Sequence, residues 1–218
     1  MQLWQIVFWA VYGCLTLTLI ALKLFKIGTR KRGVVKMLTS LSFVAAGIWG
    51  ATQSGGLSVL LCVGLCFASV GDLLWVFRHI QKCFVAGVVF FGLASCVISV
   101  YSVLNYGWIW WSAIAYAAFV VFNVLAQKKK LYSYGRNKVV LNCYTLAVGV
   151  CGFLGFSLFC RGTAHLPMFL FGLGCFAYFV SDVLLGLHLY KFRNRVVDAL
   201  NSLCYFPGML LIATSLWI

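Results

Sequence analysis

The sequence predicts an all-α, polytopic membrane protein in which eight transmembrane helices form a single integral membrane domain over residues 1–218. The chain is 64% hydrophobic and only 9% charged, whereas roughly a quarter of the residues of a soluble domain are charged. Eight apolar stretches approach the roughly 20 residues that a helix needs to cross the bilayer core. These stretches are residues 3–22, 34–51, 56–77, 83–104, 107–126, 139–159, 166–187 and 199–217.

The first four stretches are separated by short basic or glycine-containing segments. Residues 3–22 have no basic residue before them and a strongly basic flank after them. This is the reverse of a secretory signal peptide, so we expect the segment to remain as the first helix. The second stretch begins after Arg32-Gly33, the third contains Asp72, and the fourth follows Arg78.

The last four stretches carry signals of the same kind. Residues 107–126 begin among tryptophans, which favour the membrane interface, and residues 139–159 follow a second basic loop. Residues 166–187 contain Asp182, and residues 199–217 end at Trp217. Pro207-Gly208 is expected to kink this last helix, which a bundle tolerates around a cavity.

The net charge of +14 would suggest a nucleic-acid partner in a soluble protein. Here the basic residues instead lie in the loops that join each odd-numbered helix to the next, and Arg161 alone lies on the opposite side. By the positive-inside rule we expect both termini to be non-cytoplasmic and no nucleic acid to bind. A bacterial inner membrane and a eukaryotic endomembrane both fit this rule. The loop residues are Lys23, Lys26, Arg30, Lys31, Arg32 and Lys36; Arg78 and Lys82; Lys128, Lys129, Lys130, Arg136 and Lys138; and Lys191, Arg193 and Arg195.

Two parallel four-helix repeats are predicted, over about residues 1–105 and 106–218. Arg32-Gly33-Val34-Val35 and Asn137-Lys138-Val139-Val140 open the second helix of each half, and Val70-Gly71-Asp72 and Val180-Ser181-Asp182 lie in the third. Because each half has an even number of helices, the copies would be related by an axis along the membrane normal. Chance similarity between apolar helices is the alternative interpretation.

Asp72 and Asp182 are the strongest functional candidates. The chain has only three acidic residues, and a carboxylate within the bilayer core costs roughly 2.5 to 3.5 kcal/mol on insertion scales. Two carboxylates that face one cavity cannot both ionise cheaply, so one would keep its proton and the pair would supply an acid and a base. Alternatively, each aspartate bonds a neighbouring group and only holds the bundle together.

Several residues near the aspartates are candidate binding residues. Ser69 precedes Asp72 by three residues and shares its helix face. His79 follows Asp72 by seven residues, or two turns, which would place it at the mouth of a cavity. There it could bind phosphate together with Arg78 and Lys36. Contact with anionic lipid is the alternative for these basic side chains.

The second half of the chain contributes further candidates. Ser181 immediately precedes Asp182, and a small residue there allows a helix or a substrate to approach closely. Tyr144 and Tyr205 lie within apolar spans and need partners for their hydroxyl groups, so either could line the cavity. Core packing with one hydrogen bond is the alternative for both tyrosines.

No metal or cofactor is predicted. The ten cysteines are scattered through apolar segments without a Cys-x-x-Cys pair or a histidine at metal-binding spacing, so we interpret them as small packing residues. The motifs of serine esterases, zinc proteases and nucleotide-driven proteins are absent from the sequence.

The order of the helices and the two aspartate segments resemble the YhhN family, whose animal members are lysoplasmalogenases. Ser69-Val70-Gly71-Asp72-Leu73-Leu74, Phe84-Val85-Ala86-Gly87, Phe179-Val180-Ser181-Asp182 and Tyr205-Phe206 carry the resemblance. Lys36 matches the lysine of the family's Lys-Pro pair, although Met37 replaces the proline. The sequence departs from the family pattern at two further places. Ser95 and Cys96 stand where the family often has a histidine, and Pro207-Gly208 stands where it often has a glutamine.

The resemblance implies hydrolysis of the vinyl ether bond of a lysoplasmalogen to a fatty aldehyde and a glycerophospho-alcohol. Asp72 and Asp182 would share the acid and base roles, and the partners would be the lysophospholipid substrate and membrane lipids. A proton- or cation-coupled transporter that uses the same aspartates is the second hypothesis. A non-catalytic lipid-binding or scaffold protein is the third.

Overall fold

The structure is a computed structural model that describes residues 3–129, 134–162, 165–192 and 194–218, and this part of the chain is helical without strands. Eight helices are long and apolar enough to cross a membrane, which confirms the predicted fold class. They are α1 (Leu3–Leu24), α2 (Thr29–Ser54), α3 (Ser58–Val76), α4 (Gln81–Tyr106), α5 (Trp110–Lys128), α6 (Lys138–Arg161), α7 (Leu166–Leu187) and α8 (Arg195–Thr214). Short turns η1 (Gly135–Asn137), η3 (His188–Phe192) and η4 (Ser215–Trp217) complete the elements.

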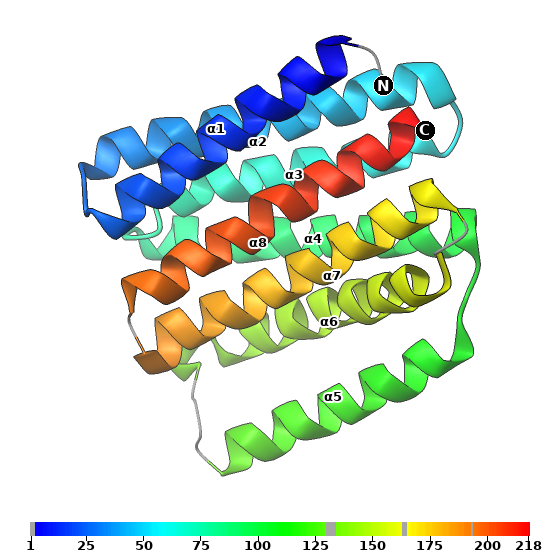
Figure 1. The fold of residues 1–218 in the computed structure, drawn as a ribbon. Helices are drawn as coiled ribbons and strands as arrows, with labels where there is room; N and C mark the ends of the chain where they lie inside the picture. The colour runs from blue at the N-terminus through cyan, green and yellow to red at the C-terminus, as the bar shows by residue number, and fades with distance from the viewer. Residues whose placement is uncertain (1–2, 130–133, 163–164, 193) are drawn as a thin grey trace.

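The helices form one bundle, and α5 lies along its edge (Figure 1). Helix α8 packs against α1, α2 and α7, while α4 packs against α3 and α6. Helix α5 packs mainly against α6. Both ends of the chain lie at the same end of the bundle (Figure 1), and the side of the membrane that this end faces stays a prediction.

The two halves of the chain share much of their packing pattern. The pairs α1 and α2, α2 and α3, and α3 and α4 correspond to α5 and α6, α6 and α7, and α7 and α8, and all six pairs are in contact. The halves differ at their first helices, because α1 also packs against α8 whereas α5 does not pack comparably against α4. The duplication itself stays a prediction.

Several helix boundaries differ from those predicted. Helix α2 begins at Thr29, so the basic residues from Arg30 to Lys36 lie on a helix and not in a loop. Helix α3 ends at Val76, earlier than expected. Helix α8 begins at Arg195, capped by the Asn194 side chain, and therefore includes Asp198. Two basic residues assigned to loops, Lys130 and Arg193, lie outside the described residues.

Close contacts between helices depend on glycines. A side chain at Gly172 on α7 would meet the backbone nitrogen of Phe159 and, at 2.7 Å, the carbonyl oxygen of Gly155 on α6. Gly71, beside Asp72, leaves room for the ring of Phe91 on α4, which a Cβ would meet at 3.0 Å. Small residues of this kind let membrane helices approach closely.

We predict that Gly172→Ala destabilises the protein by about 1–3 kcal/mol, the usual cost of overpacking. The backbone of α6 cannot move aside as a flexible side chain could. Gly13→Ala is the matched control, because a Cβ there meets nothing within 4 Å. The measurement is the midpoint of thermal unfolding in detergent, and equal midpoints for the two variants would contradict the close packing of α6 and α7.

Candidate active site

Asp72 lies at the centre of a polar network inside the bundle. Its side chain is 1% exposed, and its Oδ1 pairs with Lys36 Nζ at 2.8 Å. Its Oδ2 accepts hydrogen bonds from Ser40 Oγ at 2.6 Å and from the Tyr205 hydroxyl at 2.8 Å. Helices α2 and α8 thus both bind α3 through one carboxyl group.

The local sequence accounts for this arrangement. Lys36 and Ser40 are four residues apart on α2, so both side chains lie on the same face of that helix. The ring of Tyr205 packs edge-on against Phe43 and Phe91, which orients its hydroxyl towards Asp72. A buried carboxylate is tolerated when a cation and hydrogen-bond donors compensate its charge. The network therefore provides a cation and two hydroxyl donors for the Asp72 carboxyl group.

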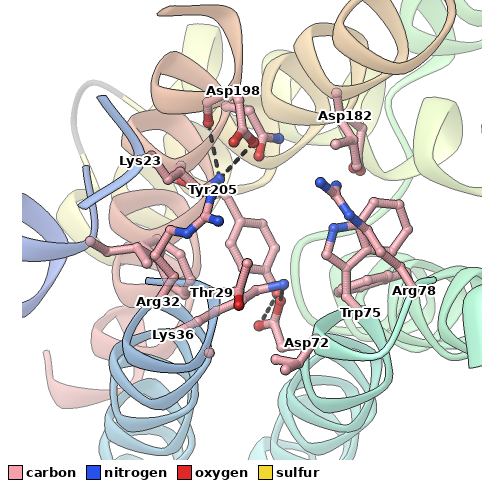
Figure 2. A pocket seen from close by; sticks show the side chains of 18 residues that line it. Lys23, Thr29, Arg32, Lys36, Asp72, Trp75, Arg78, Asp182, Asp198 and Tyr205 are labelled. Carbon is pink, nitrogen blue, oxygen red and sulfur yellow. Dashed lines mark hydrogen bonds and ion pairs between the residues drawn. The ribbon is translucent and has the colours of Figure 1, made fainter. Parts of the chain in front are cut away.

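Asp72 and Asp182 line the same cavity of about 170 Å³, which is enclosed mainly by α1, α2, α3, α7 and α8. Figure 2 shows the two aspartates at different positions around this cavity, with Lys36 beside Asp72. We call this space the polar cavity. Its lining residues are Leu19, Lys23, Thr29, Arg32, Gly33, Lys36, Asp72, Trp75, Val76, Arg78, Phe91, Asp182, Leu185, Asp198, Asn201, Ser202, Tyr205 and Phe206.

Asp182 differs from Asp72 in its surroundings. Its Oδ2 is buried and has no hydrogen-bond partner among the described residues. The Tyr144 hydroxyl on α6 interacts with the carboxyl group, but no ion pair with a described cation compensates it as Lys36 compensates Asp72. A buried carboxyl without a cation is cheaper in its neutral form. The two aspartates thus differ in how the described side chains compensate them.

Four cations line the polar cavity, more than its carboxylates can pair with. Lys23 pairs with Asp198 at 2.7 Å, and Lys36 pairs with Asp72. Arg32 has a buried Nε without a hydrogen-bond partner in the described part of the chain. Arg78 stacks over the ring of Trp75 at 5.6 Å. Figure 2 shows the side chains of Arg32 and Arg78 reaching the cavity from two sides, an arrangement suited to an anion.

The sequence model of the YhhN family matches residues 31–216, which is most of the chain and includes Asp72, Asp182 and most of the polar cavity. The chain belongs to the YhhN family. No curated protein and no solved structure matches it.

In this YhhN family member, three of the predicted binding residues line the polar cavity with the aspartates: Lys36, Arg78 and Tyr205. Lys36 is the ion-pair partner of Asp72. The sequence predicts two carboxylates that repel each other without a counter-ion, whereas the structure gives one of them a lysine partner. Tyr144 does not line this cavity but a second one, which Asp182 also lines.

Three other candidates of the YhhN protein lie away from the polar cavity. His79 is exposed, because α3 ends at Val76 and the helical spacing that would align His79 with Asp72 is lost. Ser69 is buried on α3, and the serine that bonds Asp72 is Ser40 of α2 instead. Ser181 is buried, and its hydroxyl donates to the Tyr178 carbonyl at 2.6 Å.

The positions that depart from the YhhN pattern are accommodated close to the site. Ser95 is buried and its hydroxyl bonds the Tyr178 hydroxyl at 3.1 Å. The Tyr178 ring in turn packs against Tyr205 at 5.8 Å. Gly208 packs against α7, where a Cβ would meet the Gly174 carbonyl oxygen at 3.0 Å. These residues support the tyrosine that binds Asp72.

Several residues of the polar cavity were not candidates from the sequence. Asp198 precedes the last predicted stretch, residues 199–217, but it lies in the first turn of α8, paired with Lys23. Ser40 and Arg32 each had a usable signal, because both are four residues from Lys36 and therefore share its helix face. Asn201 had no such signal in the sequence. Its side-chain amide donates to the Ser181 carbonyl at 2.8 Å, and this contact joins α8 to α7.

We predict that Lys36→Met destabilises the protein by about 3–5 kcal/mol, because the buried charge of Asp72 loses its counter-ion. The double variant Lys36→Met with Asp72→Asn should recover part of this loss, since no uncompensated charge then remains. Unfolding in detergent measures both effects. Lys23→Met is the matched control at the more exposed pair, where Asp198 is 15% exposed, and it should cost less. A Lys36→Met variant as stable as the wild type would contradict the role of this pair.

Proposed function

We propose that this protein is a membrane-embedded hydrolase that cleaves the vinyl ether bond of lysoplasmalogen-type lysophospholipids. One observation carries the proposal. Within a single cavity, Asp72 is compensated by Lys36 and by two hydroxyl donors, while Asp182 keeps an unpartnered carboxyl oxygen. A general acid and a fixed carboxylate would thereby be available in the same cavity, without the need for a metal.

The acid role is assigned to Asp182. A neutral carboxyl can donate a proton, and the uncompensated burial of Asp182 favours its neutral form. Asp72 is held as a carboxylate by Lys36, so it supplies negative charge where positive charge develops on the substrate. Tyr205 and Ser40 keep the Asp72 carboxylate in position.

The reaction balances with water as the only co-reactant. Asp182 transfers its proton to the alkenyl carbon that is not bonded to oxygen, which gives an oxocarbenium ion. Water adds to the carbon bonded to oxygen, and the proton that this water loses returns to Asp182. The hemiacetal then transfers its hydroxyl proton to the leaving oxygen as the carbon–oxygen bond breaks. The products are a fatty aldehyde and a glycerophospho-alcohol.

The cations of the polar cavity provide a site for the phosphate of the substrate. Arg32 and Arg78 line the cavity without a carboxylate partner among the described residues, and guanidinium groups match the geometry of phosphate. Thr29 lies at the same rim. Phosphate bound there would leave the vinyl ether deeper in the cavity, close to the aspartates.

We predict that purified protein in detergent releases aldehyde from a vinyl-ether lysophospholipid. Asp182→Asn and Asp72→Asn should each lower kcat by at least about 100-fold, the lower range of general acid–base contributions. Asp198→Asn is the matched comparison, because it also replaces a carboxylate of the polar cavity with an amide. It should lower kcat much less, since Asp198 is paired with Lys23 at the rim.

The controls for this assay are the folded state of each variant, measured by gel filtration, and a saturated ether lipid that cannot be protonated in this way. Absence of aldehyde release from folded wild-type protein would exclude the vinyl ether reaction. Full activity in both Asp72→Asn and Asp182→Asn would exclude the carboxylate mechanism.

A second prediction follows from protonation at carbon. In D₂O the acidic hydrogen of Asp182 exchanges for deuterium, so the aldehyde formed should carry one deuterium on the carbon next to the carbonyl group. Mass spectrometry of the trapped aldehyde measures this label. Aldehyde that is kept in D₂O without enzyme for the same time is the control for exchange after release, and an unlabelled product would contradict protonation at carbon.

A proton- or cation-coupled transporter is the second candidate function. The observation that favours it is the same pairing of a compensated and an uncompensated aspartate, because a proton relay also needs one group that can gain and lose a proton. Uptake into liposomes driven by a proton gradient, and lost in Asp182→Asn, would support this candidate over hydrolysis if no aldehyde is formed.

A further inference from the structure

A second cavity of about 250 Å³ lies between α5, α6 and α7. Its lining is dominated by apolar side chains, and we call it the apolar groove. The lining residues are Phe119, Phe122, Asn123, Ala126, Tyr134, Tyr144, Thr145, Val148, Phe179, Asp182, Val183, Gly186, Leu187, Tyr190 and Lys191.

The packing of α5 leaves this groove accessible from the bilayer. Helix α5 lies along the edge of the bundle (Figure 1), and hydrogen bonds tie it to α6. Gln127 donates to Asn142 Oδ1 at 2.7 Å, and Tyr116 donates to the Leu146 carbonyl at 3.2 Å. Phe122 lines the groove yet is 65% exposed, so the groove reaches the lipid-facing surface.

The groove and the polar cavity share one lining residue. Asp182 lines both spaces, and it is the aspartate with the unpartnered oxygen. On the groove side, Phe179 precedes Asp182 by three residues on α7. At a rise of 1.5 Å per residue, the two lie about 4.5 Å apart along the helix axis. Elsewhere in the lining, Tyr134 packs against Tyr190, and its hydroxyl bonds Thr145 at 3.0 Å.

We propose that the apolar groove binds the hydrocarbon chain of a single-tailed phospholipid whose phosphate occupies the polar cavity. The two spaces match the two parts of such a molecule. The polar cavity has two arginines without a carboxylate partner among the described residues, and the apolar groove has aromatic and aliphatic side chains. The bond that links head group and chain then lies beside the Asp182 carboxyl. The identity of the head group rests on the proposed function, whereas the chain site is a separate claim.

A photoreactive lipid tests the chain site without catalysis. The probe is a lysophospholipid with a saturated ether-linked chain that carries a diazirine near its end. We expect crosslinks to residues of the groove such as Phe119, Val148 and Phe179, mapped by mass spectrometry. An excess of the same lipid without the diazirine should compete for them.

Gly186 is a position where an added side chain would enter the groove. It lines the groove, and a Cβ there meets nothing within 4 Å. Gly186→Phe should lower the crosslink yield about tenfold, equivalent to displacing roughly two buried methylene groups. Gly186→Ala should have a smaller effect. Gly13→Phe is the matched control, because Gly13 on α1 is equally open and lines neither cavity.

The outcomes separate the chain site from the proposed reaction. Competed crosslinks in the groove that fall in Gly186→Phe support the site, even if wild-type protein releases no aldehyde. Crosslinks spread over the lipid-facing surface, or a yield unchanged in folded Gly186→Phe, would overturn it, even if aldehyde is released. If Gly186→Phe does not fold, the mapped and competed crosslinks of the wild-type protein decide between these two results.

Discussion

The ion pair between Lys36 and Asp72 is the interaction on which the centre of the bundle depends. It joins α2 to α3, and the same carboxyl group receives Tyr205 from α8. In hydrocarbon, neither charge would be stable without the other. The pair therefore helps to set the spacing of three helices around the polar cavity. Asp182 lines the same cavity without a cation partner among the described residues.

The different surroundings of the two aspartates can be traced to a sequence difference between the two halves of the chain. If Val34-Val35 and Val139-Val140 are aligned, Leu141 takes the place of Lys36, and Thr145 that of Ser40. Leu141 is apolar and buried, and the Thr145 hydroxyl donates to the Leu141 carbonyl at 2.8 Å. The second half therefore lacks the cation that compensates Asp72. Two similar carboxyl groups would thus acquire different roles through one change from lysine to leucine.

The first helix of each half differs in a related way. Helix α1 packs against α2 and α8 and brings Lys23 to the rim of the polar cavity. Helix α5 packs mainly against α6, which leaves the apolar groove beside Asp182. Helix α1 thus helps to enclose the polar cavity, while α5 borders a groove that reaches the lipid-facing surface. A bundle with this difference can offer a polar and an apolar space on either side of one carboxyl group.

The sequence by itself determined the eight helices, because apolar stretches of membrane length have few other structures in a bilayer. It also singled out Asp72 and Asp182, because their burial in hydrocarbon is costly. The partners of Asp72 were decided by tertiary structure, since Ser40 and Tyr205 come from helices whose rotation the apolar pattern leaves undefined. The predicted position of His79 was wrong because α3 ends at Val76, three residues before it. The helical spacing from Asp72 therefore does not extend to His79. The lack of a partner for Asp182 Oδ2 among the described residues also depended on packing, because it reflects which side chains the neighbouring helices bring near it.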